Sequence, residues 1–201
     1  MYYKNYQKAR DAAWKILLHS KITQLPVDVR EICKKLHCKL YTYKDGKELI
    51  KAFGVEAQIC ISDGFTVFYK GNPYIFYDSE TLETRQRFTI AHEIGHVVLE
   101  HKSKRKSIIL WRKPIIVNDP NETQANQFAA RILAPACVLN ALNIQEPTQI
   151  ATLCNISLQA AQYRAGRIKE LRQRGRFLSH PLERELLKQF EPFITSHLEC
   201  F

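Results

Sequence analysis

The sequence predicts an α+β fold in which helices pack on a small, mainly antiparallel sheet. Two observations lead to this prediction. Amphipathic helical patterns occupy both ends of the chain, and several short strand-like stretches gather between residues 39 and 77, separated by turn-forming residues. We see no internal repeat and no low-complexity segment.

The N-terminal part of the chain predicts two helices. Residues 6–19 carry apolar or small side chains on one helical stripe, namely Tyr6, Ala9, Ala13, Ile16 and Leu17. Pro26 opens a second helix that runs to about Leu36.

Four strand candidates follow, at residues 39–44, 55–62, 65–69 and 74–77. Asp63-Gly64 and Gly71-Asn72-Pro73 separate the later ones and are typical of hairpin turns. A further short strand is expected within residues 107–111.

The apolar run over residues 88–99 contains His92-Glu93-Ile94-Gly95-His96, an H-E-x-x-H pattern. We expect Asp78 or Ser79 to cap a helix here, with Glu80 and Glu83 suiting its first turn. In a helix, His92 and His96 stand one turn apart on one face and can bind one zinc ion. Glu93 is rotated by one residue and would reach a water rather than the metal. The alternative is a helix with two ordinary histidines and a solvated glutamate.

A second helical pattern begins at Asp119 and ends before Pro135. Glu122, in its first turn, has two interpretations. As a capping-box carboxylate it would reach back to the start of the helix, with Asp119 as the N-cap. As a metal ligand it would continue the apolar face that includes Ala125, whose small side chain allows a close approach to the His92/His96 helix. We favour the ligand, because a carboxylate on a core-facing stripe is costly unless it is paired or bound to metal.

Beyond Pro147 the pattern predicts two short helices over residues 148–155 and 157–171, with Ser157 as an N-cap. Their spacing resembles a helix-turn-helix. We rank a scaffold or substrate-docking role above DNA reading, because the turn lacks the glycine often found in DNA-binding versions. A last amphipathic helix over residues 182–190 precedes an apolar tail.

Three stretches together resemble the ImmA/IrrE family of zinc metallo-endopeptidases: residues 87–96, residues 122–130 and Leu133-Ala134-Pro135. The similarity extends from Leu25-Pro26-Val27 to about Arg167. Gln124 and Ala134 depart from the residues that the family often carries, and neither is a proposed metal ligand.

This resemblance implies a zincin-like fold and zinc held by His92, His96 and Glu122, with Glu93 as the catalytic carboxylate. It implies hydrolysis of a peptide bond in a bacterial regulatory protein, typically a phage-type or mobile-element repressor with a helix-turn-helix. Three residues remain open as the oxyanion donor, namely Tyr163, Arg164 and His101. Asn126 either orients the Glu122 carboxylate or hydrogen-bonds nearby backbone.

We therefore expect a zinc metallopeptidase domain over residues 1–146, a helix-turn-helix-like subdomain over 147–176, and a C-terminal helix and tail over 177–201. The alternative function is a regulator whose zinc domain binds or senses a partner, with DNA contacts through residues 157–176 and little proteolytic activity.

Composition fits a globular cytoplasmic protein: of 201 residues, 45% are hydrophobic and 25% charged. We expect no membrane span and no signal peptide. The six cysteines contain no C-x-x-C pair, so we interpret them as reduced and mostly buried. The net charge of +10 suits either a solvated surface or an acidic partner, with nucleic acid ranked behind a protein substrate.

Overall fold

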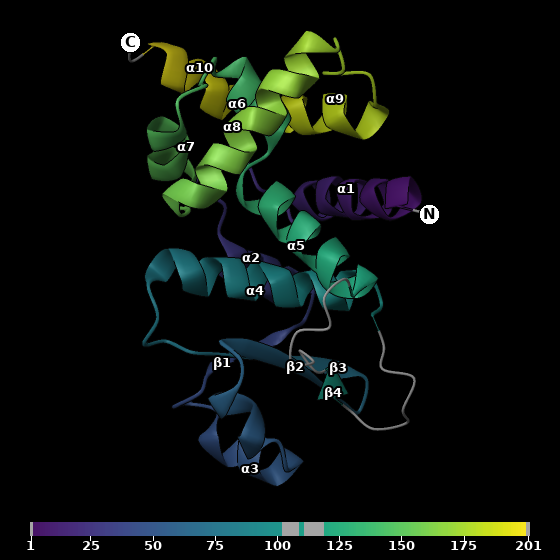
Figure 1. The fold of residues 1–201 in the computed structure, drawn as a ribbon, viewed down its shortest axis with the longest axis vertical. Helices are drawn as coiled ribbons and strands as arrows, with labels where there is room; N and C mark the ends of the chain where they lie inside the picture. Colours follow the sequence, from purple (N-terminus) through teal and green to yellow (C-terminus); the bar gives the residue numbers. More distant parts are fainter. Residues whose placement is uncertain (1, 102–108, 111–118, 200–201) are drawn as a thin grey trace. The chain divides into compact units, whose positions relative to one another are not determined.

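The structure is a computed structural model that describes residues 2–101, 109–110 and 119–199 (Figure 1). Its strands are β1 Lys39–Thr42, β2 Gly64–Tyr69, β3 Asn72–Tyr77 and β4 Ile109–Leu110. Its helices are α1 Tyr2–His19, α2 Val29–Lys35, α3 Lys47–Phe53, η1 Glu56–Cys60, α4 Glu83–Val98, α5 Pro120–Leu133, α6 Ala136–Ala141, α7 Pro147–Cys154, α8 Leu158–Gln173, α9 Pro181–Gln189 and α10 Glu191–Glu199. The predicted α+β class is confirmed.

The chain divides into two compact units, each assembled from separate segments. Unit 1 comprises Met1–Ala9 and Val29–Ala129, and unit 2 comprises Arg10–Asp28 and Ala130–Phe201. Helices α1 and α5 each contribute residues to both units. The boundaries expected at residues 146 and 176 stay predictions.

Unit 1 is built on a four-stranded mixed sheet with strand order β1-β3-β2-β4. The β2–β3 and β2–β4 pairs are antiparallel, and β1 runs parallel to β3. A tight turn at Lys70 and Gly71, both at positive φ, joins β2 to β3. The right-handed twist of paired strands favours such a turn. The sheet is thus small and mainly antiparallel, as expected.

Both faces of the sheet are covered. On one face, Phe65, Val67 and Phe76 form a cluster with Ile50 of α3. The alternate residues Thr66 and Ile75 are also fully buried, and α4 contacts both β2 and β3. Figure 1 shows α3 and α4 on opposite sides of the strands. This burial explains why β2 and β3 are apolar on both faces.

Several local predictions were wrong. Residues 55–62 were expected to form a strand because of their alternating pattern, but they contain the 3-10 helix η1, and Ile59 and Ile61 are exposed. Neither Asp78 nor Ser79 caps α4; its N-cap is Leu82, with no side-chain hydrogen bond. The Asp78 carboxylate instead accepts from the Glu80 amide in the preceding turn. Helices α3, α6 and α10 were not predicted, and α10 lies where the apolar tail was expected.

Other local predictions are confirmed. Asp119 accepts a hydrogen bond from the Asn121 amide at 2.8 Å and so caps α5. Ser157 accepts from the Ala160 amide and caps α8. Ile109–Leu110 pairs with β2, while the rest of the strand expected at 107–111 lies outside the described residues, as does the basic run 102–106.

Unit 2 consists of helices. α8 packs with α7 and α6, and α9 contacts α6 and α10. The Gln189 side-chain amide donates to the carbonyls of Leu17 and Ile22, at 3.0 and 2.7 Å, and so ties α9 to the N-terminal segment. Among the helices of the described ranges, none is long and apolar enough to cross a bilayer.

The five cysteines in the described ranges are free thiols. Four of them are buried, and only Cys60 is exposed. Burial raises the pKa of Cys38 to about 11 and that of Cys137 to about 12. These thiols therefore stay protonated and act as small apolar side chains.

Candidate metal centre

The four residues expected at the site come from two helices of unit 1. His92, Glu93 and His96 lie on α4, and Glu122 lies in the first turn of α5. The α4 side chains are buried, with 0% of His92, 2% of Glu93 and 6% of His96 exposed. The Glu122 side chain is 30% exposed, so the group is open on the carboxylate side.

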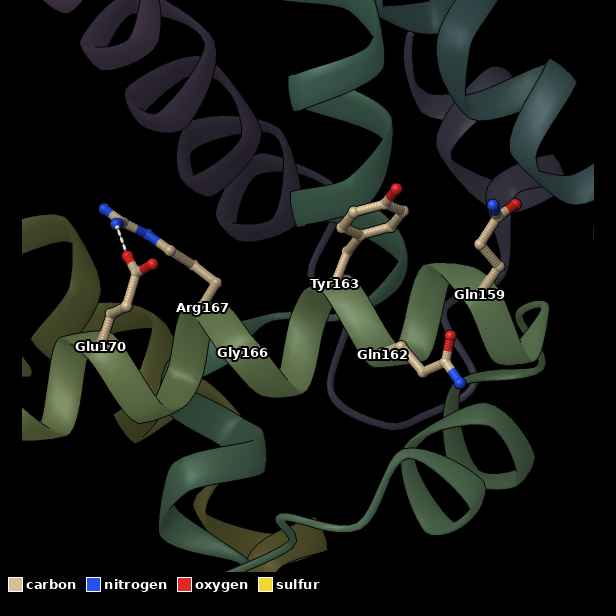
Figure 2. Close-up of a pocket in the computed structure, with 6 residues that line it drawn as sticks. All are labelled: Gln159, Gln162, Tyr163, Gly166, Arg167 and Glu170. Atoms are coloured by element: carbon tan, nitrogen blue, oxygen red, sulfur yellow. Dashed lines mark hydrogen bonds and ion pairs between the residues drawn. The ribbon is translucent and has the colours of Figure 1, made fainter.

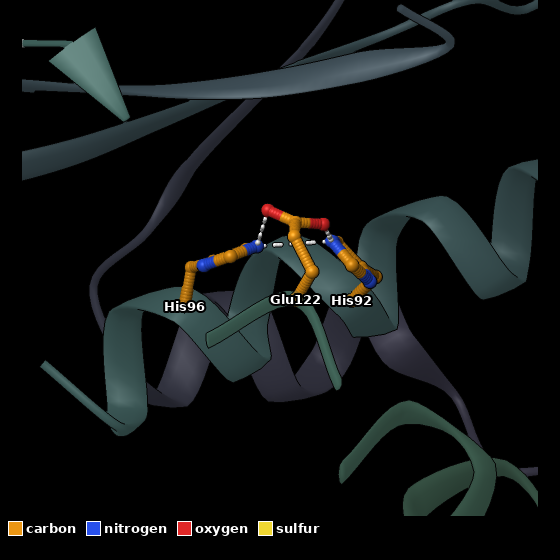
Figure 3. A group of neighbouring side chains, drawn as sticks. All are labelled: His92, His96 and Glu122. Atoms are coloured by element: carbon orange, nitrogen blue, oxygen red, sulfur yellow. Dashed lines mark hydrogen bonds and ion pairs between the residues drawn. The ribbon is translucent and has the colours of Figure 1, made fainter. Parts of the chain in front are cut away.

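Three donor groups converge. Nε2 of His92 lies 2.9 Å from Nε2 of His96. The two oxygens of Glu122 lie 3.2 Å from His92 Nε2 and 3.3 Å from His96 Nε2 (Figure 3). Ligands of one tetrahedral zinc ion, each about 2.0–2.2 Å from it, stand roughly 3.3–3.6 Å apart. The donors therefore lie close to the separations that a single ion requires, and these residues fit a metal.

The Glu122 carboxylate is ionised. Burial favours its neutral form, but hydrogen bonds with His92 and His96 outweigh burial and hold its pKa well below its usual range. An anionic oxygen ligand is therefore present next to two imidazoles. Within the described residues, these three form the group of histidine, cysteine or acidic side chains suited to hold a metal ion.

A close contact between two helices brings these donors together. A Cβ placed on Gly95 would lie 3.2 Å from the Cα and 3.3 Å from the carbonyl oxygen of Ala125, and 3.1 Å from Phe128. Ala125 itself is completely buried. The small residues on both helices thus allow α5 to approach α4, as the sequence predicted for Ala125.

Each histidine of the group has an outer partner on its Nδ1 atom. Oδ1 of Asn126 lies 2.8 Å from Nδ1 of His92. Nδ1 of His101 lies 3.2 Å from Nδ1 of His96. Asn126 was expected either to orient the Glu122 carboxylate or to hydrogen-bond nearby backbone, but its contact is with another of the donors, His92. Burial, and then the neighbouring His96, lower the pKa of His101 to about 4.

Glu93 has a partner that was not predicted. The Thr66 hydroxyl on β2 donates to Oε2 of Glu93 at 2.8 Å, and Thr66 is completely buried. The signal in the sequence was a hydroxyl between Phe65 and Val67 in an otherwise apolar strand. A buried hydroxyl requires an acceptor, and here the acceptor is the proposed catalytic carboxylate.

Two of the oxyanion candidates, Tyr163 and Arg164, belong to unit 2. The Arg164 guanidinium donates to the Ala134 carbonyl at 2.5 Å. Tyr163 is 75% exposed and lines a shallow hollow of about 620 Å³ along α8 (Figure 2). The hollow is bordered by side-chain amides and by the ion pair Arg167–Glu170. Its lining contains no histidine or cysteine that would bind a metal.

The family model for the IrrE N-terminal-like domain, Peptidase_M78, matches residues 33–165, which is more than half of the chain. The matched segment includes all three donors and Glu93. A comparison with curated proteins gave no match. The chain therefore belongs to the Peptidase_M78 family, defined by its IrrE N-terminal-like domain.

Proposed function

We propose that the protein is a zinc-dependent endopeptidase in which His92, His96 and Glu122 bind the metal and Glu93 is the catalytic base. The observation that carries the proposal is the convergence of the three donor groups, at 2.9–3.3 Å, next to a buried carboxylate on the same helix. Membership of a peptidase family supports the reaction class.

Zinc suits the donor set best. Two imidazole nitrogens and one carboxylate oxygen are the ligands of many catalytic zinc sites, which keep a fourth position open. Calcium and magnesium prefer sites made of oxygen alone. When bound, zinc would act as a Lewis acid that polarises the scissile carbonyl and lowers the pKa of water.

Glu93 is the proton carrier of the proposed reaction. One of its oxygens accepts a proton from the attacking water as the water oxygen bonds to the carbonyl carbon. The same carboxyl then delivers this proton to the nitrogen of the leaving amine as the carbon–nitrogen bond breaks. The Thr66 hydroxyl, bonded to Oε2, restricts the carboxylate to one orientation during both transfers.

We propose a bacterial regulatory protein as substrate, specifically a phage-type or mobile-element repressor with a helix-turn-helix. The resemblance of residues 87–96 and 122–130 to the ImmA/IrrE family supports this choice. The net charge of +10 is compatible with an acidic segment in such a partner.

Co-expression with a repressor encoded beside this gene tests the function. We expect wild type to cut the repressor and Glu93→Gln to leave it intact, because an amide cannot accept the proton. Glu80→Gln, an exposed change of the same chemistry on the approach to α4, is the matched control and should cut like wild type. A repressor that stays whole with wild type, or is cut equally with Glu93→Gln, would contradict the proposal.

A further inference from the structure

We propose that His101 is a positioning residue that orients His96 for metal binding. The inference deepens the proposed function and rests on it, because His96 needs a fixed ring orientation only if it is a ligand. Its basis is the end of α4, where the chain reverses and returns the His101 side chain to the last turn of the helix.

The backbone at this end forms a Schellman motif. The Glu100 amide donates to the Val97 carbonyl, and the His101 amide donates to the His96 carbonyl at 3.1 Å. Glu100 takes the left-handed conformation, with φ +55°. Glycine is the usual residue at this place, because it has no Cβ to strain. The chain thus adopts an uncommon conformation at Glu100, and the result is that His101 faces His96.

The two rings meet edge to face through their Nδ1 atoms. The nitrogens are 3.2 Å apart, and the ring planes form an angle of 74°. His101 is 7% exposed, so water competes little for this contact. A hydrogen bond between two ring nitrogens requires that one of them carries the proton and the other offers a lone pair.

The direction of that hydrogen bond follows from the other side of the His96 ring. Nε2 of His96 faces Glu122 and His92. To bind a metal there, Nε2 needs its lone pair, so the proton resides on Nδ1 and is donated to His101. His92 has the same arrangement, because Asn126 presents Oδ1, an acceptor, to its Nδ1 atom. In the metal-binding state both ligand rings are therefore held in one tautomer, by chemically different partners.

A purely structural role gives a different expectation. The residue at this position of a Schellman motif is often apolar and simply packs on the helix. Leucine at position 101 would keep such packing and remove the acceptor. Asparagine would remove most of the ring but keep an acceptor, Oδ1, near the place of Nδ1. The two substitutions therefore separate packing from hydrogen bonding.

Zinc affinity, measured by competition with a chromophoric chelator, tests the inference. We expect His101→Leu to weaken zinc binding about 10- to 100-fold, the usual loss when an outer partner of a metal ligand is removed. His101→Asn should recover most of that loss. Glu100→Gly is the matched control for the motif and should bind within about twofold of wild type, since glycine adopts this conformation freely.

Two results overturn the inference: His101→Leu binding zinc as tightly as wild type, or His101→Asn binding as weakly as His101→Leu. If His101→Leu does not fold, nitrogen-15 NMR of the wild-type histidines in the zinc-loaded protein decides instead. It should show a proton on Nδ1 of His96 and none on Nδ1 of His101, and the reverse arrangement contradicts the inference.

The outcome is separable from that of the proposed function. A protein that follows the expected order of zinc affinities but cuts no repressor refutes the endopeptidase and leaves the role of His101 intact. A protein that cuts the repressor and whose zinc affinity does not change with the His101 substitutions refutes the role of His101 and leaves the endopeptidase intact. A wild type without zinc affinity overturns both.

Discussion

At the scale of single residues, the ambiguity at Glu122 shows what a sequence leaves open. The position fits a capping box as well as a ligand, because both interpretations require a carboxylate in the first turn of a helix. In the structure, Asp119 caps α5, and both Glu122 oxygens face histidine nitrogens. Glu122 thus lies with the histidines, where the ligand interpretation expected it. The role of Thr66 was not predicted, because its partner Glu93 lies 27 residues away in the sequence and only the folded chain brings the two side chains together.

A buried carboxylate in unit 2 gives a prediction for pH. Glu183 is 4% exposed, and its carboxylate accepts a hydrogen bond from the Leu178 amide at 2.8 Å. Burial raises its pKa above the ordinary value of 4.5, although the Leu178 amide and the charges of Arg10 and Arg164 act in the opposite direction. The Cys137 thiol also lies near it, and the negative charge of Glu183 adds to burial in raising the pKa of that thiol.

Because the native state holds this proton more tightly than the unfolded chain, the contribution of Glu183 to stability is full below pH 4.5. It is lost as pH rises through the higher pKa of the native state. Glu183→Gln should therefore flatten the fall in melting temperature above pH 4.5, while its amide oxygen still accepts from Leu178. Glu185→Gln, an exposed neighbour on α9, controls for the change in net charge. Equal pH profiles for the two variants would disprove this account of Glu183.

At the scale of elements, the site depends on how closely α5 approaches α4. Gly95 and Ala125 form the contact, and Glu122 lies three residues before Ala125 on the same helix. A single methyl group on Gly95 would therefore displace a ligand without changing any donor atom. The position of His101 likewise depends on the backbone, because the left-handed conformation at Glu100 turns the chain back toward the end of α4.

The glycines of two helices provide a matched test of this contact. Gly95→Ala should lower zinc affinity, because the new Cβ would lie 3.2–3.3 Å from backbone atoms of Ala125 and push α5 away. A Cβ on Gly166 would have no neighbouring atom within 4 Å, so Gly166→Ala should leave zinc affinity unchanged. It should also stabilise α8 by about 0.5–1 kcal/mol through helix propensity. Wild-type zinc affinity in Gly95→Ala would show that the close approach is not required.

Several arginines of α8, which the sequence showed as a basic cluster, have hydrogen-bond or ion-pair partners in the structure. Arg164 donates to the Ala134 carbonyl, and Arg172 donates to the Asn140 side chain at 2.5 Å. Arg167 forms an ion pair with Glu170. Arg164 and Arg172 keep their positive charge, but these hydrogen bonds hold their guanidinium groups against neighbouring segments of unit 2 and restrict how freely they can reach a partner. DNA reading by α7 and α8 therefore stays behind protein docking in our ranking.

At the scale of the whole molecule, periodicity and capping predicted most helices, because both are local properties. The strand expected at 55–62 was wrong, since its alternating apolar residues include Ile59 and Ile61, which do not face a core. The parallel pairing of β1 with β3 was not predictable from local patterns. The same holds for the placing of Arg10–Asp28 with the C-terminal helices, which depends on contacts such as Gln189 with Leu17, 172 residues apart.

The most direct test of the metal centre is the zinc content of the purified protein, measured with the melting temperature. We expect about one equivalent of zinc in wild type and in Glu93→Gln, because Glu93 does not coordinate the metal. Glu122→Gln should retain less, and His96→Ala none. Added zinc should raise the melting temperature of wild type, since it binds the folded state. A wild type with no zinc and no thermal shift on adding it would contradict the account, as would a Glu122→Gln protein that binds zinc as tightly as wild type.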